Sequence, residues 1–156
     1  MQGKNFTINL GSLEVITERT INASAAKLFK DYTDPLLIPK WWGESSWVTS
    51  VDAQNLRVGG SWRFLQTDPN NTSFVWSGTY QEFDQSSKIV STFVLEARPE
   101  HTYVGTALFS QLSDGTTHLT ETIKFLNASD LGLMVAMGMK NKTSERLDRF
   151  ASIAEN

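Results

Sequence analysis

The polar residue with the most chemical potential in this sequence is Glu121. It alternates with Leu119, Ile123 and Phe125, so the four side chains share one face if the segment is an extended strand. A carboxylate on an apolar face needs a partner, or its pKa is raised by the loss of hydration. The pattern therefore marks Glu121 as a group that could orient a ligand or accept a proton.

Two interpretations of Glu121 are open at this point. In the first it is a general base, and Tyr80 is the second candidate for handling protons. In the second it is a structural residue that faces the sheet edge or pairs with Arg57 or Arg63. Neither Glu121 nor Tyr80 belongs to a catalytic motif, so whether the chain is an enzyme stays uncertain, and we rank a noncatalytic role above a catalytic one.

Other chemistry-bearing motifs are missing from the sequence. His101 and His118 lack the spacing of metal ligands, and surface or turn positions explain both. The pair Gly59-Gly60 lacks the context of a phosphate-binding loop and precedes a strand, which favours a bulge or a tight turn. There is no Gly-x-Ser-x-Gly motif, and the sequence has 0 Cys, which excludes disulfides and thiolate chemistry. We expect no metal and no cofactor.

Aromatic residues are concentrated in the first half of the chain. All 5 tryptophans lie between positions 41 and 76, at Trp41, Trp42, Trp47, Trp62 and Trp76. Each tryptophan can remove roughly 150 to 250 Å² from water, at about 25 cal/mol per Å². Such a cluster either fills a core or lines a large apolar cavity, and which of the two it does decides the function.

Bulk composition excludes several classes of partner. The 156 residues carry a net charge of -3, with lysine and arginine scattered along the chain. This distribution offers no electrostatic footprint for nucleic acid or an anionic membrane. The start of the sequence has no apolar stretch of signal-peptide length, and the longest later one, Leu131 to Met139, is far too short to span a membrane. We expect a soluble, cytoplasmic protein that is a monomer or a homodimer.

The elements that must position these residues can be drawn from periodicity and turn signals. Ser24 is placed as the N-cap of a short helix from Ala25 to Lys30, and Pro35 as the first residue of a second helix. Short turns separate successive strands, which predicts an antiparallel meander. We expect one domain over 13–156, preceded by residues 1–12 as an extension or as the start of the first strand. The strands are expected at 13–21, 61–67, 73–84, 87–96, 102–112 and 116–125.

A long helix is predicted to close the chain, beginning near Ser129 with Ser129 or Asn127 as its cap. Gly132 and Gly138 each weaken it by about 1 kcal/mol relative to alanine, which is tolerated more readily where a bend is needed. One face of this helix is expected to pack on the sheet, through Leu131, Val135, Met139, Thr143, Leu147, Phe150 and Ala154. The charged residues are expected mostly on the other faces, at Lys140, Lys142, Glu145, Arg146, Asp148 and Arg149.

Several motifs in this order resemble one known family. They are Trp41-Trp42-Gly43, the run Leu56 to Phe64 with its Arg-x-Gly-Gly-x-Trp element, Gly78-Thr79-Tyr80, Ile89 to Phe93, and Leu147-Asp148-Arg149-Phe150. The chain resembles the heat-shock-protein-90 ATPase activator homologue family of the START-like (SRPBCC) superfamily. The resemblance implies an α+β helix-grip fold, in which a curved antiparallel sheet wraps around a long C-terminal helix, with two short helices after the first strand.

The resemblance also implies a cavity between the sheet and the long helix. Its expected ligand-binding residues are Trp41, Trp42, Trp62, Phe64, Trp76, Tyr80, Phe93, Glu121, Val135, Met139 and Thr143. One departure concerns the last helix, where relatives usually place Gly-Trp and this chain has Lys142-Thr143. A relative's ligand therefore cannot be transferred to this chain.

Two functional classes follow from the resemblance. The first is a noncatalytic module that binds a hydrophobic small molecule or acts on a chaperone ATPase. The alternative is an enzyme similar to polyketide cyclases and dehydratases, with Glu121 or Tyr80 handling protons.

Overall fold

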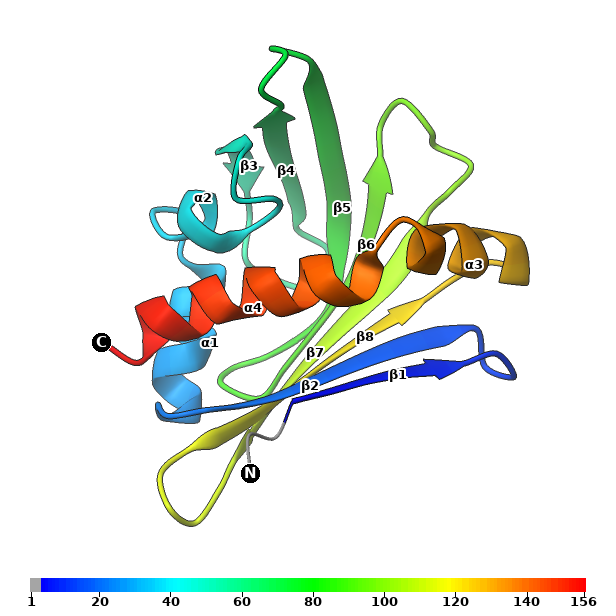
Figure 1. The fold of residues 1–156 in the computed structure, drawn as a ribbon. Helices are drawn as coiled ribbons and strands as arrows, with labels where there is room; N and C mark the ends of the chain where they lie inside the picture. Colours follow the sequence, from blue (N-terminus) through cyan, green and yellow to red (C-terminus); the bar gives the residue numbers. More distant parts are fainter. Residues whose placement is uncertain (1–3) are drawn as a thin grey trace.

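The computed structural model describes residues 4–156, and in it one antiparallel sheet curves around the C-terminal helix (Figure 1). The sheet has 8 strands in the order β1-β2-β8-β7-β6-β5-β4-β3. This arrangement confirms the predicted α+β helix-grip fold. The strands are β1 (Asn5–Asn9), β2 (Glu14–Ile21), β3 (Val48–Gln54), β4 (Ser61–Thr67), β5 (Ser73–Asp84), β6 (Lys88–Leu95), β7 (Tyr103–Gln111) and β8 (Thr117–Lys124). The helices are α1 (Ala25–Thr33), α2 (Ile38–Trp41), α3 (Ala128–Ala136) and α4 (Met139–Ala154).

The two strands that the sequence does not predict lie at the two edges of the sheet. The strand β1 pairs only with β2, and β3 pairs only with β4. An edge strand has a single neighbour and keeps more of its side chains in water, so its apolar alternation is weak. The strand β1 falls within the predicted extension 1–12, of which residues 1–3 lie outside the described part of the chain.

The two short helices follow the first long strand as expected, but the second is placed differently. Ser24 caps α1, and its side chain accepts a hydrogen bond from the Lys27 amide. Pro35 lies in the turn between the helices and does not begin α2, which contains Pro39 in its first turn. Proline is tolerated at that position because its missing N–H has no partner in a helix.

The predicted C-terminal helix is broken into two. Gly138 adopts a φ of 91°, the left-handed conformation that glycine reaches at the lowest cost, and α4 begins after it. Asn127 caps α3 by accepting a hydrogen bond from the Asp130 amide. The break corrects the expectation of one continuous helix from Ser129 and changes which side chains of α3 face the sheet.

Part of the core lies where α1 packs against both β7 and α4. We call this the filled region and define it by Phe29, Phe109, Leu147 and Phe150, whose exposed fractions are between 0 and 4%. The rings of Phe29 and Phe109 meet edge to face, with their centroids 5.3 Å apart. This packing anchors α4 and leaves the N-terminal half of that helix free to cover the rest of the concave face.

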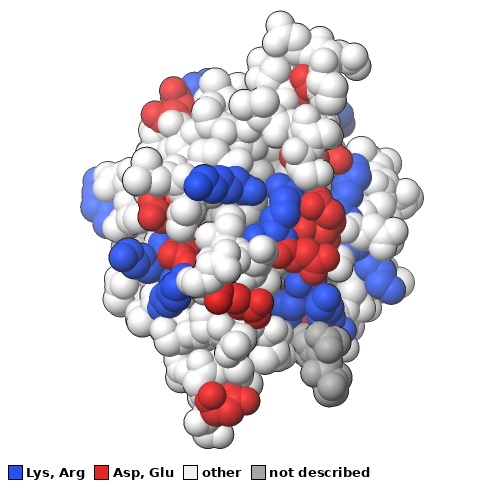
Figure 2. Space-filling view, turned by 60° about the vertical axis from the view of Figure 1, so that its left-hand side comes forward, with Lys and Arg blue, Asp and Glu red and all other residues white. Residues whose placement is uncertain are grey.

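The outer surface mixes charges of both signs. On the face that Figure 2 turns toward the viewer, basic and acidic side chains are interspersed without a broad region of one sign. Within residues 4–156, no helix is both long and apolar enough to cross a membrane.

Candidate functional site

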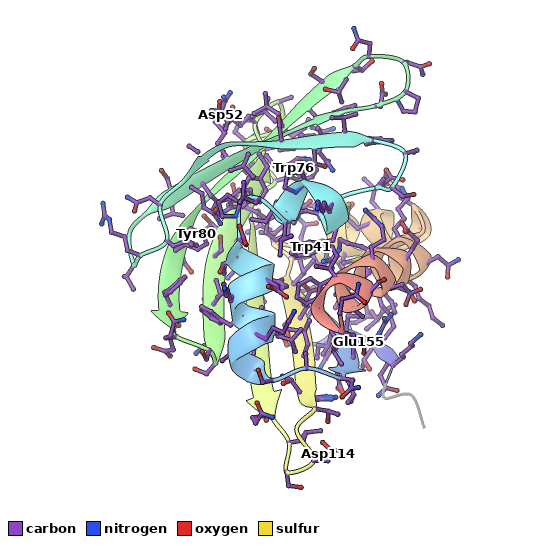
Figure 3. The ribbon with its side chains drawn as sticks, turned by 90° about the vertical axis from the view of Figure 1, so that its left-hand side faces the viewer. Trp41, Asp52, Trp76, Tyr80, Asp114 and Glu155 are labelled. Atoms are coloured by element: carbon purple, nitrogen blue, oxygen red, sulfur yellow. The ribbon has the colours of Figure 1, made fainter. Side chains whose placement is uncertain are left out.

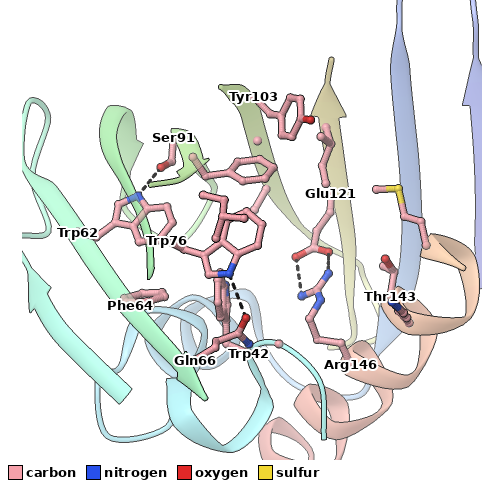
Figure 4. Close-up of a pocket in the computed structure, with 18 of the residues that line it drawn as sticks. Trp42, Trp62, Phe64, Gln66, Trp76, Ser91, Tyr103, Glu121, Thr143 and Arg146 are labelled. Carbon is pink, nitrogen blue, oxygen red and sulfur yellow. Dashed lines mark hydrogen bonds and ion pairs between the residues drawn. The ribbon is translucent and has the colours of Figure 1, made fainter. Parts of the chain in front are cut away.

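A cavity of about 610 Å³ lies between the concave face of the sheet and α4. We call the surrounding part of the protein the hollow region and define it by Trp62, Trp76, Phe93, Tyr103 and Met139, which line the cavity (Figure 4). Most of the lining is aromatic or aliphatic. The tryptophans therefore form both a core and a cavity wall.

The predicted ligand-binding residues line this cavity with the exception of Val135. Val135 packs instead against the small cluster of Val15, Tyr103 and Phe125. The reason is the break at Gly138, because the predicted stripe through Val135 and Met139 requires an unbroken helix. Contact with a ligand stays a prediction for the residues that do line the cavity.

The aromatic wall of the cavity is held in place by hydrogen bonds. Trp76 donates its indole N–H to Gln66 Oε1 at 3.0 Å, and Trp62 donates to Ser91 Oγ at 2.7 Å (Figure 4). Gly78 allows this packing, because a Cβ there would lie 1.8 Å from the Thr92 carbonyl oxygen and 2.7 Å from Trp62 Nε1. The rings are thus preorganised without a ligand.

Trp42 packs against the aromatic wall of the cavity, whereas Trp41 is almost completely buried behind it. The ring centroids of Trp42 and Phe64 are 5.1 Å apart. Trp41 is only 1% exposed and contacts the rings of Tyr32 and Phe150, at 4.9 and 4.8 Å. Trp41 is the last residue of α2 and belongs to the core.

Glu121 is the charged group inside the cavity, and its partner is Arg146 (Figure 4). Arg146 binds both carboxylate oxygens, one of them at 3.3 Å, and Tyr32 donates its hydroxyl to Oε2. The Arg146 guanidinium also lies 5.7 Å from the centre of the Trp41 ring, within cation–π range.

The expected pairing of Glu121 with Arg57 or Arg63 is therefore wrong. Arg63 points to the outside of the sheet, where it binds Asp52 and Glu96, each at 3.1 Å. Arg57 is exposed and lies in the turn before Gly59. The carboxylate faces the helix side of the sheet, where Arg146 of α4 and Tyr32 of α1 reach it.

The pairing keeps Glu121 ionised. Burial by itself would raise the pKa of Glu121, but the charge of Arg146 and the hydrogen bonds from Arg146 and Tyr32 outweigh it and hold the pKa below the ordinary 4.5. Burial raises the pKa of Tyr32 well above 10.0, and the Glu121 charge raises it further. Since both carboxylate oxygens already accept hydrogen bonds, this geometry disfavours a general-base role for Glu121.

Two pairs of polar side chains contribute to the lining of the cavity. His101 Nδ1 lies 2.8 Å from Asp130 Oδ2, which joins the β6–β7 loop to the first turn of α3. Lys142 Nζ lies 4.0 Å from Glu44 Oε2. Leu133 and Met137 also line the cavity and are more than half exposed. The sequence predicted only a surface or turn position for His101. The structure adds a contact between His101 and Asp130.

His118 is half-buried on β8, with Nε2 3.4 Å from Glu18. Within residues 4–156, no group of 3 or more histidine, aspartate and glutamate side chains is arranged to hold a metal ion.

Comparison with known proteins identifies the family. The family described as "Activator of Hsp90 ATPase homolog 1-like protein" matches residues 22–155. The chain belongs to this family. None of the curated proteins matches the sequence.

Solved structures of other proteins share the fold. Protein Ms6760 from Mycobacterium smegmatis is 18% identical, with a TM-score of 0.83, covering 96% of this chain and 94% of that chain. A Rhodobacter sphaeroides protein is 15% identical, with a TM-score of 0.86 and coverage of 96% and 97%. An Arthrobacter aurescens protein is 17% identical, with a TM-score of 0.85 and coverage of 96% and 90%. At these identities the likeness establishes the fold alone.

Within this Activator of Hsp90 ATPase homolog 1-like chain, sequence reasoning missed two residues of the charged network. Arg146 follows Met139 and Thr143 at steps of four and three, so helical spacing places it on their face of α4. Tyr32 follows Leu28 and Phe29 in the same way on α1. Arg146 was assigned to another face because charged side chains usually face water, whereas Tyr32 lay beyond Lys30, the last residue of the predicted helix.

Proposed function

We propose that this Activator of Hsp90 ATPase homolog 1-like protein binds a hydrophobic small molecule in its cavity. The observation that carries the proposal is the preformed volume of about 610 Å³ behind an aromatic wall. Pockets that bury most of a drug-sized ligand have volumes of roughly 300 to 1,000 Å³ and a mainly apolar lining with a few polar groups. Trp62 and Trp76 already have hydrogen-bond partners, so a ligand meets ring faces that are fixed in place.

Thr143 offers a direct test because it lines the cavity where the family resemblance leads us to expect tryptophan. The variant Thr143→Trp should fill part of the cavity. Asn141→Trp is the matched control, because Asn141 is exposed on the same helix and does not line the cavity. Both variants add the same indole ring, and they differ in whether that ring enters the cavity.

The measurement is a fluorescence titration with the neutral dye N-phenyl-1-naphthylamine. We expect saturable binding by the wild type, at least about tenfold weaker binding by Thr143→Trp, and affinity within about twofold of wild type for Asn141→Trp. Absence of saturable binding by the folded wild type would contradict the proposal. Equal affinity of Thr143→Trp and the wild type would place the dye elsewhere.

A second candidate function is action on a chaperone ATPase, and the observation that favours it is the family match over residues 22–155. It is tested by pull-down with heat-shock protein 90 and by the ATPase rate with and without this protein. Stimulation that survives Thr143→Trp would assign the role to the surface, and stimulation that the variant abolishes would assign it to the cavity. Absence of both binding and stimulation would count against this function.

The cyclase or dehydratase alternative has less support. Glu121 is ionised with both oxygens occupied, and burial raises the pKa of Tyr80 despite the hydrogen bond from Gln54, so neither group is prepared to accept a proton near neutral pH. Turnover that is unchanged in Glu121→Gln would eliminate the proposed base. A cytoplasmic location and a monomeric or homodimeric state stay predictions.

A further inference from the structure

Arg146 has more hydrogen-bond donors than the rest of the chain uses. Its guanidinium carries five N–H groups, and Glu121 accepts hydrogen bonds from Nη1 and Nη2 (Figure 4). The Nε–H group has no acceptor within residues 4–156. It is nevertheless accessible, because the fully enclosed polar atoms without a partner in that range are Arg19 Nε, Trp41 Nε1 and Gln54 Oε1. Arg146 therefore keeps a donor that another molecule can reach.

The surroundings of Arg146 leave this donor open to the cavity. Trp41, which lies between α2 and α4 in Figure 3, covers one face of the guanidinium at 5.7 Å from the ring centre. Glu121 occupies the tip of the guanidinium. Arg146 lines the cavity, and Thr143, one helical turn earlier, lines it with a small side chain. The edge that carries Nε is therefore the part of the guanidinium that a ligand can contact.

The Glu121–Arg146 pair decides which charge the ligand group can have. The two charges cancel, and the side chains are only 12% and 19% exposed. A ligand carboxylate would place a second anion next to Glu121, where little water screens the repulsion. A hydrocarbon would displace water from the Nε–H group and leave a charged donor unpaired. A neutral group with an acceptor oxygen avoids both costs.

We propose that the cavity binds apolar molecules that carry a carbonyl group, such as ketones and esters, and that Arg146 donates a hydrogen bond to the carbonyl oxygen. A carbonyl has no proton of its own, so it needs only the donor that Arg146 supplies. Glu121 holds the guanidinium in place and disfavours carboxylates. The aromatic wall with Trp76 and Phe93 takes the apolar body of the ligand. The inference rests on the proposed ligand-binding function and adds the chemistry of the head group.

The test measures how well three naphthalene probes displace N-phenyl-1-naphthylamine from the wild type at pH 7. The first probe, 2-acetylnaphthalene, carries a carbonyl. In 2-isopropenylnaphthalene a CH₂ group replaces the carbonyl oxygen, and 2-naphthoate carries a carboxylate. We expect the ketone to bind at least about tenfold more tightly than the hydrocarbon. We expect 2-naphthoate to bind no more tightly than the hydrocarbon.

The variant Glu121→Gln should change this preference, because it keeps the size of the side chain and removes the anion. Arg146 then lacks its counter-charge, and a ligand carboxylate can supply one. We expect 2-naphthoate to bind Glu121→Gln at least about tenfold more tightly than it binds the wild type. Glu145→Gln is the matched control, since Glu145 is on the same helix and does not line the cavity. Its affinity for 2-naphthoate should stay within about twofold of wild type.

A second variant replaces the whole charged network by apolar side chains, which is tolerated better than removing one partner. It combines the changes Tyr32→Phe, Glu121→Leu and Arg146→Met. This variant should still bind the dye, and its affinities for the ketone and the hydrocarbon should differ by less than about threefold. The control Arg63→Gln/Glu96→Gln removes an ion pair from the outside of the sheet and should keep the full preference. Circular dichroism checks the folding of every variant, and the network variant tests the proposal if Glu121→Gln does not fold.

The outcomes separate this inference from the proposed function. Equal binding of the ketone and the hydrocarbon by the wild type would overturn the carbonyl site while leaving ligand binding intact. Tightest binding of 2-naphthoate by the wild type would also overturn it, as would a ketone preference that survives in the folded network variant. Dye binding without displacement by any naphthalene probe would refute the carbonyl site alone. Absence of dye binding by the folded wild type would contradict both proposals.

Discussion

The filled region and the hollow region are made from similar side chains on one concave sheet, yet only one of them is a solid core. In the filled region α1 packs between β7 and α4, so Phe29 and Phe150 are no more than 1% exposed. In the hollow region α4 covers the sheet without α1, and Trp76 and Phe93 keep part of their surface accessible. The difference shows that a second covering element, and not residue type, decides where aromatic residues become a core.

The Glu121–Arg146–Tyr32 network lies at the boundary of the two regions. Tyr32 faces the filled region, where its ring is 5.2 Å from Phe109 and 5.4 Å from Phe150. Glu121 and Arg146 line the cavity. The network therefore closes the inner end of the hollow region with paired charges and couples the stability of one region to the electrostatics of the other.

The largest expected effect comes from deleting a ring in the filled region. Phe150→Ala should destabilise the protein by about 3 to 5 kcal/mol, because the side chain is 0% exposed and its cavity cannot collapse between Trp41 and Tyr32. Phe93→Ala makes the same chemical change in the hollow region and should cost about half as much or less. The measurement is urea unfolding of both variants.

Equal losses in these two variants would break the distinction between the regions. Dye binding should rank the two variants in the opposite order to stability, because Phe93 lines the cavity and Phe150 does not. Phe93→Ala should alter the affinity for N-phenyl-1-naphthylamine, whereas folded Phe150→Ala should retain it.

The next effect concerns the boundary, where Glu121→Gln leaves Arg146 as a largely buried charge without its counter-ion. Glu121 and Arg146 have side chains that are 12% and 19% exposed. Removing one partner of a buried pair is strongly unfavourable, so we expect a loss of about 3 kcal/mol at pH 7 by urea unfolding. Glu145→Gln on the same helix removes a half-exposed carboxylate and should cost less than about 1 kcal/mol.

The pH dependence of this loss identifies its cause. The folded-state pKa of Glu121 is depressed below 4.5, so its contribution is fully present above that value and is lost as the pH falls through the folded-state pKa. The stability difference between wild type and Glu121→Gln should be constant from about pH 6 to 8 and should shrink below about pH 4.5. A difference that does not change on acidification would assign the loss to packing.

The sequence predicts the central strands and misses the edges for the same physical reason. Strands β4 to β8 have neighbours on both sides and alternate clearly, and Trp62 on β4 and Trp76 on β5, both expected to bind a ligand, line the cavity. The strand β3 is an edge strand with mixed exposure, and Gln54 was missed with it. A residue that lines the cavity was therefore missed where sequence periodicity is weakest.

The charged network was missed for a different reason. Met139, Thr143 and Arg146 occupy one helical face by spacing alone, but the charge of Arg146 argued for the solvent side. An inward-facing Arg146 is favourable because Glu121 on β8 lies opposite it. This is a tertiary contact, which the spacing of residues within α4 does not reveal. The break at Gly138 is tertiary in the same sense, because Gly132 has the same sequence signal and lies inside α3.

The smallest expected effect tests this break, which separates the helix at the cavity mouth from the helix that covers both regions. Gly138→Ala should destabilise the protein by about 1 to 2 kcal/mol, because the φ of 91° places an alanine in the left-handed region. Gly132→Ala should instead stabilise it by roughly 0.5 to 1 kcal/mol, since Gly132 is helical. An added Cβ meets nothing closer than 4.0 Å at either position, so the comparison isolates backbone conformation.

Thermal unfolding measures both variants, and dye titration shows whether the break also shapes the mouth. Met137 and Leu133 lie on the α3 side of Gly138 and line the cavity, whereas the filled region depends on the far end of α4. Gly138→Ala should therefore weaken dye binding while Gly132→Ala leaves it unchanged. Changes of the same sign and size in both variants would mean that the left-handed glycine does not set the break, and α3 would then be held in place by its His101–Asp130 contact.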